Sequence, residues 1–164
     1  MARRARTPGW AIALAAAALL GGCGEGGPAR DASGAIDESS ETRLIQLRAG
    51  DCMGNLRDAL LHPDGGHNGV PKVKAVKCSN AHDAEILRVT PLRDGPWPEY
   101  PVVDGEAARG RLEIDARVKR IRQALGPLTL VSFRPSQPRW DFEDQHAIYF
   151  VALYDKPQRK PAPD

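Results

Sequence analysis

The sequence predicts an α+β domain in which a largely antiparallel sheet of about five strands carries one long helix on one face. Short segments that alternate apolar and polar residues, typical of strands, stand on both sides of one long segment with helical periodicity. The order along the chain is β-β-β-α-β-β. Strands that follow one another through short connections pair in antiparallel fashion, so this order favours one sheet and one covering helix.

Three segments before the helix are expected to be strands. Residues 44–53, "LIQLRAGDCM", alternate Leu or Ile with polar residues and end in a Gly-Asp turn. Residues 70–78, "VPKVKAVKC", set valines among lysines, as in a half-buried strand. Residues 84–92, "AEILRVTPL", lead into the proline-rich segment 94–105, where we expect regular structure to stop.

The long helix is expected over residues 104–125. Asp104 is a candidate N-cap, and Gly126 followed by Pro127 is a stop signal. One apolar stripe recurs with helical spacing at Ile114, Val118, Ile121 and Leu125. The remaining positions are charged, chiefly arginine, which is typical of a solvated outer face.

The clearest strands follow the helix. They are residues 128–136, "LTLVSFRPS", and residues 146–155, "HAIYFVALYD". In the second segment both alternating sets of side chains are apolar, so we expect this strand in the interior of the sheet, with both faces covered.

The first 22 residues have the features of a secretory signal peptide. Three arginines near the start precede an apolar run of 11 residues, 10–20. A bilayer span takes about 20 apolar residues, so the run is too short to cross a membrane comfortably. The run ends in "LLGGC", which resembles the bacterial lipobox, in which the cysteine receives a diacylglycerol and becomes the mature N-terminus. We therefore expect a lipoprotein anchored through Cys23 on the extracytoplasmic face of the cell membrane; the alternative is an ordinary cleaved signal with an incidental cysteine.

Composition divides the rest of the chain into three parts. Residues 23–42 are rich in small and acidic residues and are expected to form a flexible tether. Residues 43–155 have the size of one domain, and the proline-containing tail 156–164 is expected to fray. Three of the 23 basic residues lie in the leader, leaving 20 basic against 21 acidic residues from Cys23 onward. This balance lacks the strongly basic field that nucleic-acid binding requires.

Two cysteines remain in the exported domain, Cys52 and Cys78. In an oxidising compartment they most simply form one disulfide. The functional alternative is a nucleophilic Cys78 with His82 as its base. Neither His82 nor the other three histidines (His62, His67 and His146) show the short ligand spacing of zinc sites. We therefore expect neither a metal nor a cofactor, with a metal-binding lipoprotein as an alternative.

Several motifs together resemble the septum formation-related domain of actinobacterial membrane proteins and lipoproteins. They are "AGDC" at 49–52, "VKAVKCSNAHDAEIL" at 73–87, a helix, and "PSQPRWDFEDQHAIYFVALYD" at 135–155. The matching positions are Gly50, Asp51, Cys52, Cys78, His82, Glu85, Pro135 and Trp140. The family commonly carries a second cysteine pair; here Ala108 and Ala147 stand about where those cysteines would fall.

The resemblance implies a structural corner in which Gly50 and Asp51 on one side meet Cys78 and His82 on the other, tied by the Cys52–Cys78 bridge. His82 and Glu85 would then fix the turn into the following strand by hydrogen bonds. It also implies an envelope location and a link to cell division, without an established reaction.

Two functions from different classes fit these observations. The first is a small binding or scaffolding module with an envelope protein or cell-wall partner, and its candidate contact residues are Trp97, Tyr100, Arg139 and Trp140. The second is an envelope hydrolase that uses the carboxylates of "WDFED", namely Asp141, Glu143 and Asp144. On a strand Asp141 and Glu143 would share a face. The sequence carries none of the common hydrolase motifs, so we expect that the protein is not an enzyme.

Overall fold

The structure is a computed structural model that describes residues 27–61, 72–143 and 145–163. Its strands are β1 (Ser40–Arg43), β2 (Cys52–Met53), β3 (Lys72–Val76), β4 (His82–Pro91), β5 (Leu128–Phe133) and β6 (Ala147–Gln158). Its helices are the 3₁₀ helix η1 (Leu44–Gln46), α1 (Leu56–Leu61), α2 (Tyr100–Leu125) and α3 (Gln137–Glu143).

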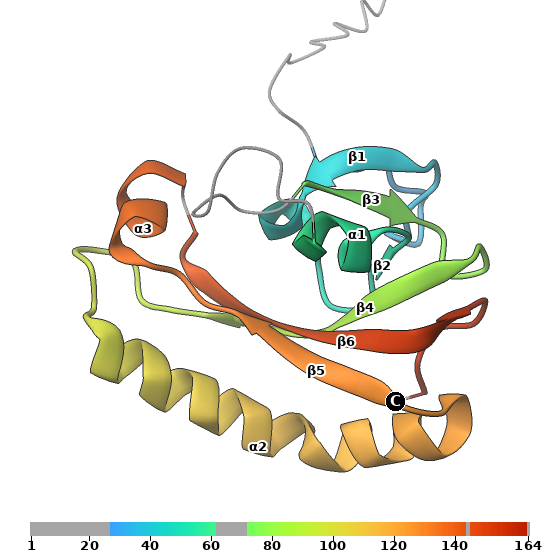
Figure 1. Ribbon diagram of the computed structural model, residues 1–164. Coiled ribbons are helices and arrows are strands. Elements are labelled where there is room, and N and C mark those ends of the chain that lie inside the picture. Colours follow the sequence, from blue (N-terminus) through green and yellow to red (C-terminus); the bar gives the residue numbers. More distant parts are fainter. Residues whose placement is uncertain (1–26, 62–71, 144, 164) are drawn as a thin grey trace, which may run out of the picture.

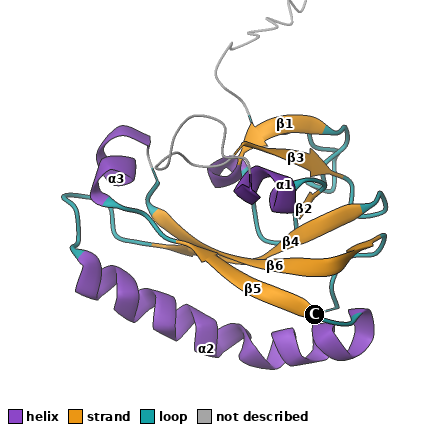
Figure 2. Ribbon diagram, viewed as in Figure 1, coloured by secondary structure: helices purple, strands orange, loops and turns teal. Residues whose placement is uncertain are grey.

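The strands form one six-stranded sheet in the order β1-β3-β2-β4-β6-β5, and every neighbouring pair is antiparallel. The long helix α2 runs beneath the sheet, while α1 and the β1–β3 edge lie on the other side (Figure 1 and Figure 2). The predicted α+β class with an antiparallel sheet is confirmed, with one strand more than expected.

Strand β6 is buried on both faces, as its sequence predicted. One set of its side chains belongs to a hydrophobic cluster beneath the sheet, which we call the lower cluster, together with apolar residues of α2; these are Ile148, Phe150, Ala152 and Tyr154. The alternate residues Tyr149, Val151 and Leu153 belong to a second cluster on the opposite face, which we call the upper cluster. Strand β6 lies between β4 and β5, so its backbone is paired on both sides.

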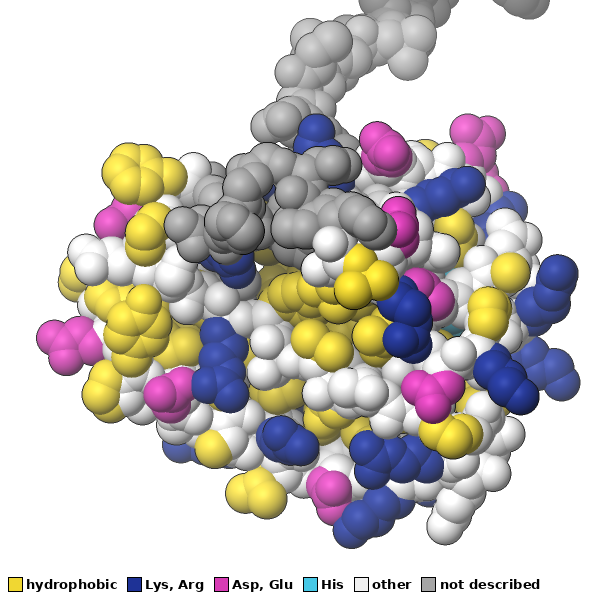
Figure 3. Space-filling view, viewed as in Figure 1, with side chains coloured by type: hydrophobic (Ala, Val, Ile, Leu, Met, Phe, Trp, Pro, Cys, Tyr) yellow, Lys and Arg dark blue, Asp and Glu magenta, His cyan; other side chains and the backbone are white. Residues whose placement is uncertain are grey.

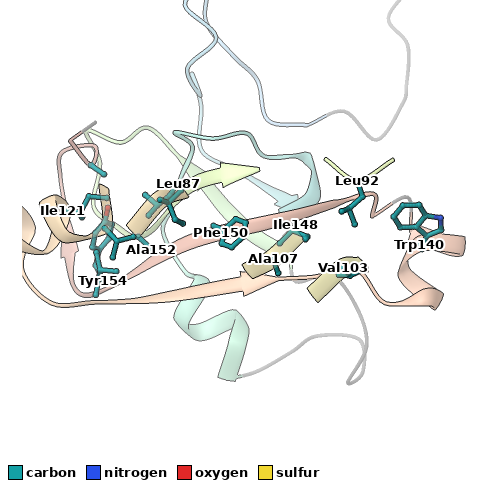
Figure 4. Packing of buried hydrophobic residues seen from close by; sticks show 14 residues of the cluster. Leu87, Leu92, Val103, Ala107, Ile121, Trp140, Ile148, Phe150, Ala152 and Tyr154 are labelled. Carbon is teal, nitrogen blue, oxygen red and sulfur yellow. The ribbon is translucent and has the colours of Figure 1, made fainter. Parts of the chain in front are cut away.

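The long helix begins earlier than its sequence suggested. It starts at Tyr100 rather than at Asp104, because Pro101 fits the first turn of a helix, where its missing N–H is not needed. Asp104 therefore lies inside the helix, and its carboxylate pairs with Arg134 at 2.5 Å. The predicted apolar stripe faces the sheet, with Ile114 and Ile121 buried in the lower cluster. Figure 4 shows this cluster running from Trp140 to Tyr154.

Helix α2 also approaches the sheet closely through a glycine. A Cβ atom added to Gly110 would lie 2.6 Å from two ring atoms of Phe150. The absence of a side chain here allows the helix to rest directly on the Phe150 ring of β6.

The prediction of a strand over residues 44–53 is mostly wrong. Residues Leu44–Gln46 form η1, and only Cys52 and Met53 pair in the sheet. Between them Gly50 adopts φ 90°, a left-handed conformation that favours glycine. This turn brings the Gly50 N–H to the carbonyl of Ile86 at 2.7 Å.

The expected tether 23–42 differs from the structure wherever the structure describes it. From Gly27 onward the chain packs on the domain: Ile36 is buried in the upper cluster, and Ser40–Arg43 form β1. The carboxylate of Asp51 accepts two hydrogen bonds from the guanidinium of Arg30, at 2.9 and 2.6 Å. A buried apolar residue and a largely buried ion pair therefore help to hold a segment whose composition indicated a linker.

The expected fraying of the tail 156–164 differs from the structure as well. Strand β6 continues to Gln158, and Ala162 is buried in the lower cluster. The Arg117 guanidinium of α2 donates a hydrogen bond to the carbonyl of Pro163 at 3.3 Å.

Among the described residues, no helix combines the length and apolar character that crossing a membrane requires.

The Arg30–Asp51 pair should decide whether the N-terminal segment is held on the domain. Replacing Asp51 by alanine leaves a nearly buried guanidinium and the Arg48 N–H without this acceptor, so we expect a loss of about 3 kcal/mol of unfolding free energy. Limited proteolysis should cut D51A between residues 27 and 39, while the wild type resists. The control is Asp37→Ala, which removes an exposed ion pair with Lys77 and should change little. Equal protection of D51A and the wild type would contradict the expectation.

Candidate functional site

Two groups of side chains stand out, and the first lies where β2 meets β4. The register of this pair sets Cys52 directly opposite Glu85. The pairing of β4 with β6 shifts between His82 and Ala84. Such an irregularity changes the face to which a side chain points. It brings His82 close to Tyr154 of the lower cluster, with ring centroids 6.0 Å apart, whereas Ala84 belongs to the upper cluster.

A disulfide joins Cys52 and Cys78, as the cysteine count predicted, with the two Cα atoms 5.3 Å apart. Cys52 is fully buried, whereas Cys78 is partly exposed, and its Sγ lies 3.4 Å from the carbonyl oxygen of Gly50. The bridge occupies both sulfurs, so Cys78 holds no free thiol for nucleophilic chemistry in this state. The Gly-Asp-Cys and Cys-x-x-x-His segments do meet at one corner.

Glu85 is the most enclosed carboxylate of this corner, with 1% of its surface exposed. Its Oε2 accepts a hydrogen bond from the Ala162 N–H at 2.7 Å and from the Tyr154 hydroxyl at 3.4 Å. Its Oε1 lies 3.6 Å from the Arg117 guanidinium. Burial raises the pKa of Glu85 above its ordinary value of 4.5, against the opposing effects of the Ala162 N–H and Arg117. Burial, and next the nearby Glu85 charge, raise the pKa of the Tyr154 hydroxyl.

His82 is equally enclosed, with 1% of its surface exposed. Its Nδ1 lies 2.9 Å from the carbonyl oxygen of Asn80, which can only accept, so Nδ1 carries the proton. Its Nε2 is buried and has no hydrogen-bond partner among the described residues.

Asp83, which the sequence places between these two residues, serves a different purpose. Its carboxylate accepts hydrogen bonds from the N–H groups of Leu56 and Arg57, at 3.1 and 2.9 Å. It therefore stabilises the start of α1 on the upper face and does not reach the corner.

The second group is a cluster of aromatic side chains at the other end of the sheet. The Trp97 ring contacts the Tyr100 and Trp140 rings edge-on, with ring centroids 5.3 and 5.8 Å apart. Trp140 in turn stacks on His146 at 4.2 Å, and its Nε1 donates a hydrogen bond to the Gly95 carbonyl. The structure therefore brings together Trp97, Tyr100 and Trp140, three of the candidate contact residues.

Only part of this cluster is accessible. Trp140 is 3% exposed and belongs to the lower core, so it supports Trp97 rather than offering a contact surface. Tyr100 is 57% exposed and Trp97 is partly exposed. Arg139 is also partly exposed, on α3.

A shallow groove of about 720 Å³ opens beside the exposed aromatic rings. It is lined by Pro96, Trp97, Glu99, Tyr100, Pro101, Gln137 and Asp141, and we call it the aromatic groove. Both of its charged lining residues are acidic. Figure 3 shows exposed hydrophobic side chains with acidic ones among them at the end of the molecule that carries α3 and the start of α2.

Two features of the segments that form this groove were not predicted from the sequence. Phe142 on α3 is 86% exposed, an unusual position for a phenylalanine. Glu99 adopts φ 65°, a strained conformation for a residue with a side chain, and such strain clusters at functional sites. Neither has a sequence signal, because exposure and backbone angle depend on how α3 and the proline-rich segment fold.

The carboxylates expected for a hydrolase are not arranged as predicted. Asp141 and Glu143 belong to helix α3 rather than to a strand. Asp144 lies outside the described residues, as do His62 and His67. The strand on which the hydrolase hypothesis relied for a shared face is a helix instead.

The raised pKa of Glu85 predicts a specific pH dependence of stability. Its folded-state pKa lies above the unfolded value near 4.5, so its contribution is fully present below that pH and is lost as pH rises through the folded-state pKa. Urea unfolding across a pH series should show this loss in the wild type and a shallower one in Glu85→Gln. The control Glu113→Gln, which removes an exposed partner of Arg88, should keep the wild-type slope. Parallel curves for E85Q and the wild type would count against this assignment.

Comparison of the chain with models of known protein families, with curated proteins and with solved structures finds no match. The resemblance to the septum formation-related domain therefore stays a prediction from the motifs.

Proposed function

We propose that the protein is a lipid-anchored binding module on the extracytoplasmic face of the cell membrane, with the aromatic groove as its partner-binding surface. The anchor is Cys23 of the lipobox-like segment, and the link to septum formation follows from the family resemblance alone. The observation that carries the binding role is the groove itself. It combines exposed aromatic rings, two carboxylates and strained backbone in one place.

The groove is built like an interface rather than like a reaction centre. Trp97 and Tyr100 offer rigid aromatic surface, and the buried Trp140 holds Trp97 in place. Aromatic side chains of this kind contribute much of the binding energy at protein interfaces. Because Glu99 and Asp141 are both acidic, the groove favours a partner that presents positive charge or hydrogen-bond donors beside an apolar surface. The proposed partner is a basic segment of another envelope protein.

Membrane attachment through Cys23 is the first expectation to check. Replacing Cys23 by serine removes the thiol that would be acylated, and the protein should move from the membrane fraction to the soluble extracytoplasmic fraction. Fractionation with detection of the domain measures this shift. Cys78→Ser serves as the control, because it removes a cysteine of the folded domain and should leave the membrane attachment intact. A C23S protein that stays in the membrane fraction would refute the anchor.

Binding through the groove predicts site-specific crosslinking in cells. A photoreactive phenylalanine analogue at position 100 should give a discrete adduct with an envelope protein. The same analogue at Leu112, which is 78% exposed on α2 but does not line the groove, should not. Reversing the groove's charge with Glu99→Lys and Asp141→Lys should reduce the position-100 adduct. Equal crosslinking at both positions would show that the groove has no special role.

A further inference from the structure

The buried corner between β2 and β4 holds a set of metal-ligand atoms that the proposed binding function does not use. One ligand atom each from Cys52, His82 and Glu85 lie within 4.8 Å of one another, and all three residues are buried. The group combines three donor types: sulfur, imidazole nitrogen and carboxylate oxygen. The second sulfur of the disulfide, from Cys78, is bonded directly to that of Cys52.

The tautomer of His82 suits metal binding. Its Nδ1–H donates to the backbone carbonyl of Asn80, and the lone pair on the buried Nε2 has no partner in the part of the chain that the structure describes. Leaving a buried acceptor unpaired is unfavourable, so its retention calls for a reason. Metal-binding histidines commonly donate the other ring N–H to a backbone carbonyl in this way, which fixes the tautomer and the ring orientation.

Glu85 keeps capacity for a further contact. Its Oε2 is occupied by Ala162 and Tyr154, but the partner of Oε1 is Arg117, at 3.6 Å, longer than a hydrogen bond. Hydrogen bonds therefore hold the carboxylate through Oε2, while Oε1 has only the longer ion pair with Arg117.

We propose that, once the Cys52–Cys78 disulfide is reduced, the two cysteines, His82 and Glu85 form a four-coordinate site for a zinc-like divalent cation. A dithiol reductant supplies two electrons and two protons, becomes a disulfide itself, and leaves two thiols on the protein. Cation binding then releases the two thiol protons to solvent, and the four ligand atoms are two thiolate sulfurs, His82 Nε2 and one Glu85 oxygen. In the oxidised protein neither sulfur is a thiolate, and the site does not form.

The geometry requires only a small contraction. Zinc bonds of about 2.3 Å to sulfur and about 2.0 Å to nitrogen or oxygen place tetrahedral ligand atoms about 3.5 Å apart. One donor atom of each of Cys52, His82 and Glu85, a ring nitrogen in the case of His82, already lies within 4.8 Å of the others, and cleavage of the disulfide frees both cysteine side chains to adjust. The reductant has access because Cys78 is partly exposed, so its sulfur can be attacked while Cys52 leaves as the thiolate.

The types of ligand atom and their charges determine which cation the site would prefer. Thiolate and imidazole ligands favour zinc and similar transition metals over magnesium or calcium, which prefer oxygen. Two thiolates and one carboxylate exceed the charge of a divalent cation by one, and the Arg117 guanidinium beside Glu85 offsets that excess.

The proposed centre is independent of the aromatic groove. Tyr154, whose hydroxyl contacts Glu85, and Trp140, which supports the groove, mark opposite ends of the lower cluster in Figure 4. Either proposal can therefore fail without affecting the other.

The test is a titration of the purified full-length protein with Co²⁺, a spectroscopic substitute for zinc, before and after reduction with a phosphine. We expect one equivalent to bind to the reduced protein, with thiolate charge-transfer bands and tetrahedral d–d bands that Zn²⁺ abolishes. The oxidised protein should give neither. Glu85→Gln and His82→Ala should each weaken Co²⁺ binding by about 100-fold or more, while His146→Gln, at the other end of the sheet, should not.

Circular dichroism of the same samples keeps the test decisive. If the reduced protein is unfolded without metal and refolds when Zn²⁺ is added, the site is supported, since metal binding is then coupled to folding. Three results would overturn the proposal. They are no Co²⁺ bands in a folded reduced protein, an unfolded reduced protein that Zn²⁺ does not rescue, and equal affinities for the wild type, E85Q and H82A, which would indicate adventitious binding to thiols alone.

Discussion

The burial of both faces of β6 is the constraint on which the other layers depend. Its alternating side chains are apolar on each side, so a single covering helix would leave half of them in water. Helix α2 covers one face. The other is covered by elements that are individually weak: η1, the six-residue α1 and the chain from Gly27 to β1. The N-terminal segment is consequently part of the domain, and the Arg30–Asp51 pair ties it to the same turn that leads into the disulfide.

The fold was predictable wherever one periodicity dominated. The stripe along α2 and the two-sided apolar pattern of β6 each allow a single placement. The segment 44–53 misled because its apolar residues fit two periods. Leu44 and Leu47, both buried, lie three apart, which suits a 3₁₀ turn as well as an irregular strand. Ser40–Arg43 could not be identified from local sequence, because an edge strand of four polar residues acquires its structure from its partner β3.

The residues of the corner were predictable by name but not by arrangement. The motif points to Cys52, Cys78, His82 and Glu85. What it omits is the register shift that brings His82 near Tyr154, and the contacts to Glu85 from Arg117 and Ala162, which are distant in sequence. The aromatic cluster shows the same limit. Trp97 and Trp140 stand more than forty residues apart and meet because α2 and β5 return the chain to the start of the helix. The strand expected around Asp141 was wrong for a local reason, since the residues from Gln137 to Glu143 form the short helix α3.

The ordered N-terminal segment has a consequence for how such a module would search for its partner. With Cys23 as the proposed lipid attachment, only residues 24–26 separate the anchor from the packed chain at Gly27, a reach of at most about 14 Å. A domain on so short a linker would stay in a thin layer along the membrane surface, whereas a longer linker would let it move through a larger volume around its anchor. Encounters become two-dimensional, and the effective concentration of any membrane-bound partner at the groove rises accordingly.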